Sequence, residues 1–134
     1  MTRRFLNFNA TLAAMALMMA GASGQPLLAE DGMPEAAPPV LTLEQQTGLR
    51  CSAAFALVAY GQSRGDAAAL AWPAVADRGR EFFVRFSAQL MDETGMSRDQ
   101  VAALLGQEAQ DLSATDRLGA VMPACLLLLD SADL

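Results

Sequence analysis

From residue 42 onward, apolar positions recur every three or four residues, which is the spacing of one face of an α-helix. Polar or glycine-containing stretches interrupt this pattern and divide it into four amphipathic segments. The predicted helices cover about residues 42–61, 73–94, 97–112 and 115–130. Short connections between consecutive helices favour antiparallel neighbours. We therefore predict an all-α fold, a small four-helix up-down bundle.

Several residues mark where these helices begin and end. Thr42 and Ser97 are each followed three residues later by glutamine, Gln45 and Gln100, which is the pattern of a capping box. Gly95 is the expected C-terminal stop of the second helix. These signals define the ends of the helices more sharply than the apolar pattern alone.

Glycine and proline add local detail to the helical pattern. Residues 66–72 are rich in alanine and predict a short helical turn, after which Pro73 suits the first position of the second helix. Gly79 lies on the apolar stripe of that helix, where it indicates the close approach of another helix. Pro123 removes a hydrogen bond inside the last helix, so we expect either a kink near Gly119 or a helix that starts afresh at the proline.

The first 41 residues have the composition of an export signal and a linker. Arg3 and Arg4 precede an apolar run and the small residues 20–22, which predicts a signal peptide over residues 1–22, with a cut after Ala29 as the alternative. The paired arginines also occur in twin-arginine signals, and either export route indicates the periplasm. The apolar run is too short for a stable membrane anchor. Residues 23–41 are rich in proline and acid and predict a disordered leader to a helical domain of residues 42–134.

The chain has two cysteines, Cys51 in the first helix and Cys125 in the last. Exported domains of this size use disulfides to supplement a small core. In an up-down bundle the first and last helices are antiparallel neighbours, and the two cysteines would lie at similar heights along them. We therefore predict a Cys51–Cys125 disulfide that ties these helices together.

Charge and composition exclude several kinds of function. The formal net charge is −6, and loss of Arg3 and Arg4 with the signal would leave 15 acidic against seven basic residues. A chain this acidic lacks the electropositive surface that nucleic acids need. It also has no histidine, the most frequent general base near pH 7 and the most common metal ligand. We therefore expect no enzyme, no cofactor and no metal site.

Two kinds of non-enzymatic function remain. The first is a protein–protein interaction of the chaperone-like, inhibitor or immunity type, through the polar face of the second helix and an aromatic anchor. The candidate partner surface comprises Arg78, Arg80, Glu81, Arg85 and Trp72. The alternative is a periplasmic carrier of an apolar small molecule inside the bundle. Its candidate lining comprises Phe55, Phe82, Phe83, Phe86, Met91 and Met122. A cavity between the first, second and last helices would favour the carrier.

One acidic residue falls within an apolar sector of the predicted third helix. Glu108 shares this sector with Leu104, Leu105 and Leu112. A glutamate in such a position usually lies at the edge of the core, with its carboxylate in water. We expect the same of Glu108.

Overall fold

Five helices make up most of the part of the chain that the structure describes. The computed structural model describes residues 39–114 and 117–134, which fall in one compact unit and are 80% helical without a strand. The helices are α1 (Leu43–Ser63), α2 (Ala67–Leu70), α3 (Ala76–Thr94), α4 (Arg98–Ser113) and α5 (Arg117–Ser131). The all-α prediction is confirmed. The predicted signal peptide, all but the last residues of the leader and the first two positions of the predicted last helix lie outside the described residues.

The helix ends follow the sequence signals closely. The Thr42 hydroxyl accepts from the Gln45 backbone N–H at 3.2 Å, and the Gln45 side-chain oxygen accepts from the Thr42 N–H at 2.9 Å. Ser97 and Gln100 make the same pair of hydrogen bonds at the start of α4. Gly95 ends α3 with a φ of 71°, a left-handed conformation that favours glycine. These three predictions are confirmed.

The connection between α1 and α3 differs from the prediction at one point. The helical turn expected within residues 66–72 is α2, but Pro73 does not begin the next helix, which starts only after Val75. The reason lies in the Gln62 side chain, whose Nε2 donates to the carbonyl oxygens of Trp72 and Pro73 at 3.1 and 2.9 Å. Because these carbonyls are bound to the end of α1, the segment stays outside the helix.

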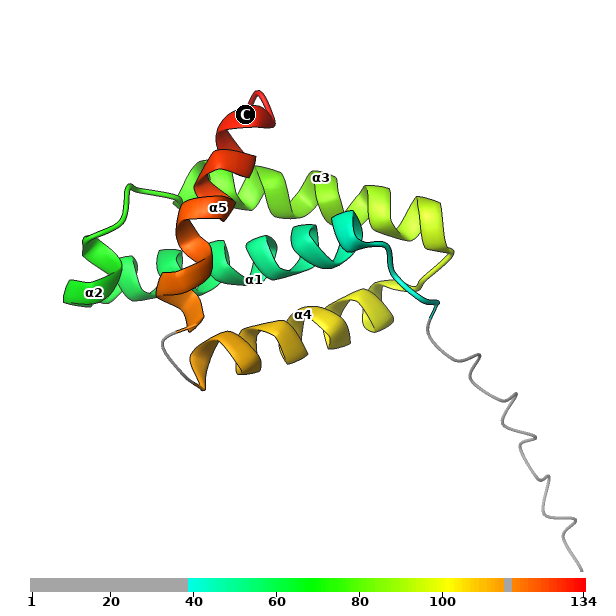
Figure 1. Ribbon diagram of the computed structural model, residues 1–134, viewed down its shortest axis with the longest axis horizontal. Coiled ribbons are helices and arrows are strands. Elements are labelled where there is room, and N and C mark those ends of the chain that lie inside the picture. The colour runs from blue at the N-terminus through cyan, green and yellow to red at the C-terminus, as the bar shows by residue number, and fades with distance from the viewer. Residues whose placement is uncertain (1–38, 115–116) are drawn as a thin grey trace, which may run out of the picture. The chain divides into compact units, whose positions relative to one another are not determined.

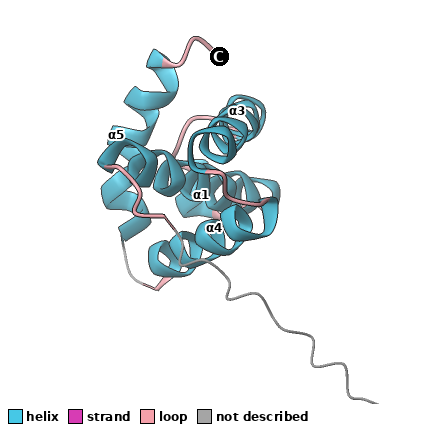
Figure 2. Ribbon diagram, turned by 90° about the vertical axis from the view of Figure 1, so that its right-hand side faces the viewer, coloured by secondary structure: helices cyan, strands magenta, loops and turns pink. Residues whose placement is uncertain are grey.

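Helix α1 lies at the centre of the fold and packs against each of the other four helices. It runs beside α3 and α4, and its direction is opposite to that of α3 (Figures 1 and 2). Gly79 of α3 lies close against α1, since an added Cβ there would lie 2.8 Å from the Cβ of Phe55. The rings of Phe55 and Phe82 form a T-shaped pair with their centroids 5.5 Å apart. The close helix contact predicted from Gly79 is confirmed.

Helix α5 has a different place from the one expected. It crosses α1 and α3 steeply and does not run alongside α1, so the four-helix up-down bundle is wrong for its last member (Figures 1 and 2). The buried residues of α5 are Met122, Cys125 and Leu129. Partly buried apolar residues on either side of them, among them Leu118, Val121 and Ala132, also pack against the main core. Because α3 and α4 already flank α1, a crossing helix covers the remaining apolar part of its surface.

Helix α5 is also continuous through its proline. It extends from Arg117 to Ser131 with Pro123 in its interior, so a fresh start at Pro123 is wrong. The proline ring lies on an exposed position of the helix, between the buried Met122 and Cys125. The lost hydrogen bond is therefore accommodated at the surface, while the apolar side of α5 remains intact.

The disulfide between Cys51 and Cys125 is present. The two Cα atoms are 5.2 Å apart, and each cysteine is only 2% exposed. The bond joins α1 to α5 at their crossing, so the prediction is confirmed although the two helices are not the antiparallel neighbours from which it was argued. Around it lies the main core, formed by residues from α1, α3, α4 and α5. No helix in the described ranges is long and apolar enough to span a membrane.

Candidate functional site

A groove of about 400 Å³ lies between α1, α3 and α5 and is called here the main groove. Helix α1 contributes its first two turns, α3 its second half, and α5 its C-terminal end. The lining residues are Thr42, Glu44, Gln45, Gly48, Phe82, Arg85, Phe86, Gln89, Leu90, Glu93, Leu128, Ala132 and Leu134. The groove therefore lies between the first, second and last long helices.

The floor of the main groove is apolar and closely packed. The rings of Phe82 and Phe86 are stacked at a centroid distance of 6.1 Å, with an angle of 4° between their planes. Gly48 makes this possible, because a Cβ at that position would overlap the ring of Phe86. Leu90 and Leu128 complete the floor from α3 and α5. A ligand in the groove would meet two aromatic rings and branched aliphatic side chains.

Polar side chains on the rim of the groove bind one another. The Glu93 carboxylate accepts from the Gln89 Nε2 at 2.6 Å and from the Gln45 Nε2 at 3.0 Å, so it links α3 to the start of α1. These two hydrogen bonds hold the pKa of Glu93 below its ordinary value, and the carboxylate stays charged near neutral pH. Arg85 donates from its Nε to Glu81 at 2.7 Å. Glu93 and Arg85 therefore each have a partner on the protein, while Glu44, the third charged residue of the lining, is exposed.

The structure divides the predicted apolar lining between different places. Phe82 and Phe86 lie in the main groove, whereas Phe55 and Phe83 line a second pocket between α1 and α3. Met122 is fully buried, and Met91 packs against the smaller core formed around Leu90, Met96 and Val101. Leu128 and Leu134 were missed as lining residues. Only the crossing of α5, which the sequence pattern does not encode, brings them to the groove.

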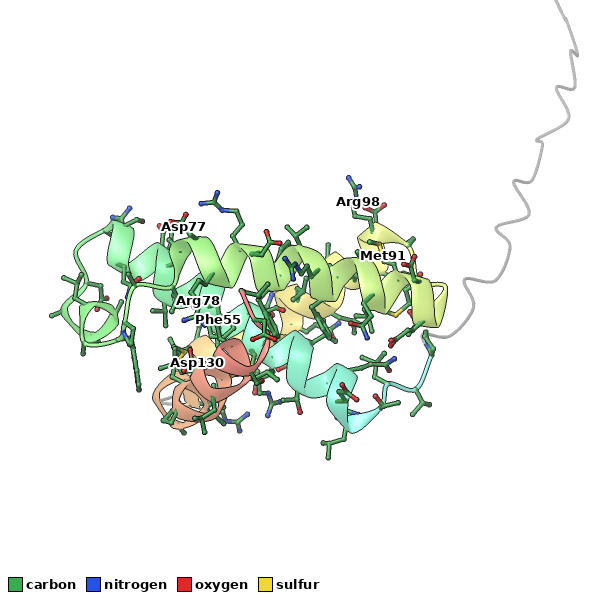
Figure 3. The ribbon with its side chains drawn as sticks, turned by 90° about the horizontal axis from the view of Figure 1, so that it is seen from above. Phe55, Asp77, Arg78, Met91, Arg98 and Asp130 are labelled. Atoms are coloured by element: carbon green, nitrogen blue, oxygen red, sulfur yellow. A yellow bond between two sulfur atoms is a disulfide. The ribbon has the colours of Figure 1, made fainter. Side chains whose placement is uncertain are left out.

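Arg78, from the predicted partner surface, contacts the end of α5. Its Nη2 donates to the Leu129 carbonyl at 3.1 Å and to the Asp130 carboxylate at 2.9 Å, and its Nε donates to the Leu134 carbonyl at 3.0 Å. Figure 3 shows Arg78 and Asp130 side by side where α3 meets α5. The Leu129 carbonyl also accepts from the Ala132 N–H at 3.3 Å, so Arg78 is a second donor to the end of α5. The contact with Leu134 joins this residue, three positions past the end of α5, to α3.

The other residues of the predicted partner surface are not equivalent. Arg80, Glu81 and Arg85 are exposed on α3, with Arg80 3.5 Å from Asp77 and Arg85 paired with Glu81. Trp72 is half-buried against the main core. Three of the five predicted residues are therefore exposed on α3, while Arg78 contacts α5 and Trp72 packs against the main core.

A further ion pair connects α1 with α4. The Arg50 Nε donates to the Glu108 carboxylate at 2.9 Å, and the Glu108 side chain is 24% exposed. This hydrogen bond, together with the negative charge of Glu108, raises the pKa of Arg50. Glu108 is at the edge of the apolar sector, as expected, but its carboxylate has a protein partner as well as water. Its position between two helices points to a structural role.

Comparison with models of protein families, with curated proteins and with solved structures finds no match to this chain. Within residues 39–114 and 117–134, no group of three or more acidic or cysteine side chains is placed to hold a metal ion. The functional interpretation therefore depends on the chemistry of the grooves and surfaces just described.

Proposed function

We propose that this protein is a non-enzymatic binding protein that carries a small apolar molecule in the main groove. The observation that carries this proposal is the groove between α1, α3 and α5, whose lining includes the apolar side chains of Phe82, Phe86 and Leu128. Its size of about 400 Å³ lies within the range of about 300–1,000 Å³ that is usual for small-molecule sites. Carriage of an apolar molecule also requires no histidine, metal or catalytic dyad.

The rim of the groove supports a neutral ligand. Glu93 is bound by two glutamine amides, and Arg85 by Glu81, so each of these charges has a partner on the protein. A charged ligand would have to replace these hydrogen bonds, whereas an apolar ligand covers the floor without disturbing them. Burial of apolar surface against Phe82, Phe86 and Leu128 supplies the affinity.

The proposed place of action is the periplasm. The buried disulfide supports an oxidising compartment, because such bonds persist outside the reducing cytosol. The positively charged and apolar pattern of residues 1–22 supports export to that compartment. A soluble carrier there would shield an apolar molecule from water.

A second candidate function is the recognition of a partner protein through α3. The supporting observation is that Phe83 and Val84 are 38% and 54% exposed next to Arg80. Aromatic and arginine side chains are favoured at the centres of protein interfaces. If α3 binds a partner protein, substitutions at Val84 should abolish partner binding. Substitutions in the main groove should leave partner binding unchanged.

The carrier proposal is tested by fluorescence titration of the oxidised protein with the neutral apolar probe N-phenyl-1-naphthylamine. Ala132→Trp fills the main groove, and Ala102→Trp, at an exposed position of α4 outside the groove, is the matched control. We expect saturable binding of one probe per chain by the unaltered protein and the control. The groove-filling variant should lose at least about tenfold in affinity, equivalent to about 1.4 kcal/mol.

Two checks make this titration decisive. Melting curves of both tryptophan variants establish that they fold, and Leu128→Glu, which introduces a charge into the floor, gives a second way to block the groove. Equal probe binding by all variants would place the probe elsewhere on the molecule and contradict the proposal. Absence of saturable binding by the unaltered protein would contradict it as well.

A further inference from the structure

The main groove is polar at one end and apolar at the other. Its polar end lies where α1 begins and α3 ends, because Gln45 donates to Glu93 there at 3.0 Å. Its apolar end lies at α5, which the hydrogen bonds of Arg78 join to the first half of α3. Figure 1 shows the same arrangement, with α1 beginning beside the end of α3 and α5 crossing nearer the start of α3. A ligand along the groove would therefore meet a different environment at each end.

The apolar part of the groove is long and can be reached by a ligand. The lining follows α3 from Phe82 to Glu93, a distance of about 16 Å at the rise of an α-helix. Phe86, Leu128 and Leu134 are partly exposed, so a ligand can contact their side chains. A volume of about 400 Å³ spread over that length suits one extended hydrocarbon chain.

The charged groups at the polar end are hydrogen-bond acceptors. Glu93 is exposed, and each of its two oxygens accepts one hydrogen bond, from the amide of Gln45 or of Gln89. A carboxylate oxygen has a second lone pair, so Glu93 can accept from a ligand without losing either of these bonds. Its lowered pKa keeps it ionised near neutral pH. Hydrogen bonds to an ionised acceptor are about twice as strong as those between neutral groups.

The polar end also disfavours an anionic head group. Glu44 and Glu93 each carry a negative charge, whereas the N-terminus of α1 contributes only about half a positive charge. Arg85 is the cation of the lining, but Glu81 binds it at 2.7 Å, and it lies about 12 Å along α3 from Glu93. The electrostatic potential at the polar end is therefore negative. An uncharged donor such as a hydroxyl fits there better than a carboxylate.

We propose that the carried molecule is a single-chain amphiphile of the long-chain alcohol class. Its hydrocarbon chain would lie along Phe86 and reach Leu128 and Leu134 at α5. Its hydroxyl would donate a hydrogen bond to Glu93 at the opposite end of the groove. This inference rests on the proposed carrier function, which takes a neutral ligand and so favours a hydroxyl over an ammonium group as the donor.

The test is displacement of N-phenyl-1-naphthylamine from the oxidised protein, near neutral pH, by three compounds of similar chain length. They are 1-decanol, its isomer 1-methoxynonane, whose ether oxygen cannot donate, and the anion decanoate, each below its solubility limit or micelle concentration. We expect 1-decanol to compete about two- to fivefold better than the ether, which is the usual effect of one exposed hydrogen bond. Decanoate should compete at least about tenfold worse than the alcohol, because two carboxylates repel it.

Two variants assign the head group to Glu93. Glu93→Gln removes the charge and keeps the shape of the side chain, so 1-decanol should lose its advantage over the ether, and decanoate should compete better than before. Asp77→Asn is the matched control, because it removes one charge at the other end of α3, where Asp77 is 96% exposed and does not line the groove. It should leave competition by all three compounds unchanged. Melting curves establish that both variants fold.

The outcomes separate this inference from the carrier function itself. If the probe binds but 1-decanol fails to displace it, competes no better than the ether or competes no better than decanoate, the inference is overturned and the carrier function stands. The same holds if Glu93→Gln and Asp77→Asn give the same result. Absence of saturable probe binding by the unaltered protein would overturn both.

Discussion

The Cys51–Cys125 disulfide offers the prediction whose magnitude is best defined. The bond joins residues 74 positions apart, so its loss frees a long loop in the unfolded chain. For a loop of this length the chain-entropy relation gives about 4.5 kcal/mol of stabilisation at 25 °C. A small domain has only about 5–15 kcal/mol of stability in total. We therefore expect the reduced protein to be close to the limit of folding.

Two perturbations remove the disulfide in different ways. Reduction by a thiol reagent breaks the cross-link and retains both sulfur atoms, so it isolates the effect of the loop. The double variant Cys51→Ala/Cys125→Ala also removes both sulfur atoms from sites that are 2% exposed, and the resulting voids add to the loss. We therefore expect the double variant to be somewhat less stable than the reduced protein.

The assay is thermal unfolding followed by circular dichroism at a single pH, with and without reductant. A domain of this size changes its melting temperature by about 4–8 °C for each kcal/mol, so we expect a fall of about 20 °C or more on reduction. Urea unfolding of the same samples provides the free energy directly. A reduced protein that melts within a few degrees of the oxidised one would refute the conclusion that this bond holds α5 on α1.

Four further predictions concern single residues. Gly79→Ala should destabilise the protein by about 1–3 kcal/mol in urea unfolding, because the new methyl group would lie 2.8 Å from a phenylalanine Cβ of α1. Gly106→Ala, where nothing lies within 4 Å, should instead stabilise it by up to about 1 kcal/mol. Arg78→Met should cost about 1–2 kcal/mol, since the arginine is 44% exposed, and should accelerate amide hydrogen exchange at the end of α5. Gln89→Leu should raise the pKa of Glu93 in an NMR titration, because it removes the largest cause of the lowered value. A carboxylate with a lowered pKa stabilises the fold above its unfolded-state pKa and loses this effect as the pH falls through the lowered value, so the variant should lose less stability on acidification.

Local features of this fold were predictable because they depend on neighbours in the sequence. The capping boxes at Thr42 and Ser97 each require two residues three positions apart, and the stop at Gly95 requires one residue with freedom at positive φ. The disulfide was predictable because the chain has just two cysteines and an export pattern. Gly79 indicated a helix contact because it interrupts an apolar stripe.

Features that depend on distant residues were not predictable in this way. The start of α3 is set by Gln62, a polar residue whose amide binds carbonyls ten and eleven positions away. Arg78 was assigned to a partner surface. Its contacts at the end of α5 are more than fifty residues away in the sequence, so the local pattern could not indicate them. The crossing of α5 depends on which part of α1 the other helices leave uncovered. The sequence allowed a cavity between the first, second and last helices. The residues that line the main groove could not be identified without the position of α5.

The most direct test of the carrier function is a native mass measurement of the oxidised protein, isolated without detergent from periplasmic extract. We predict one apolar molecule bound per chain in the unaltered protein and in Ala102→Trp, and none in Ala132→Trp. Unaltered protein that carries no such molecule and takes up no N-phenyl-1-naphthylamine, or an Ala132→Trp variant that retains the bound molecule, would contradict it.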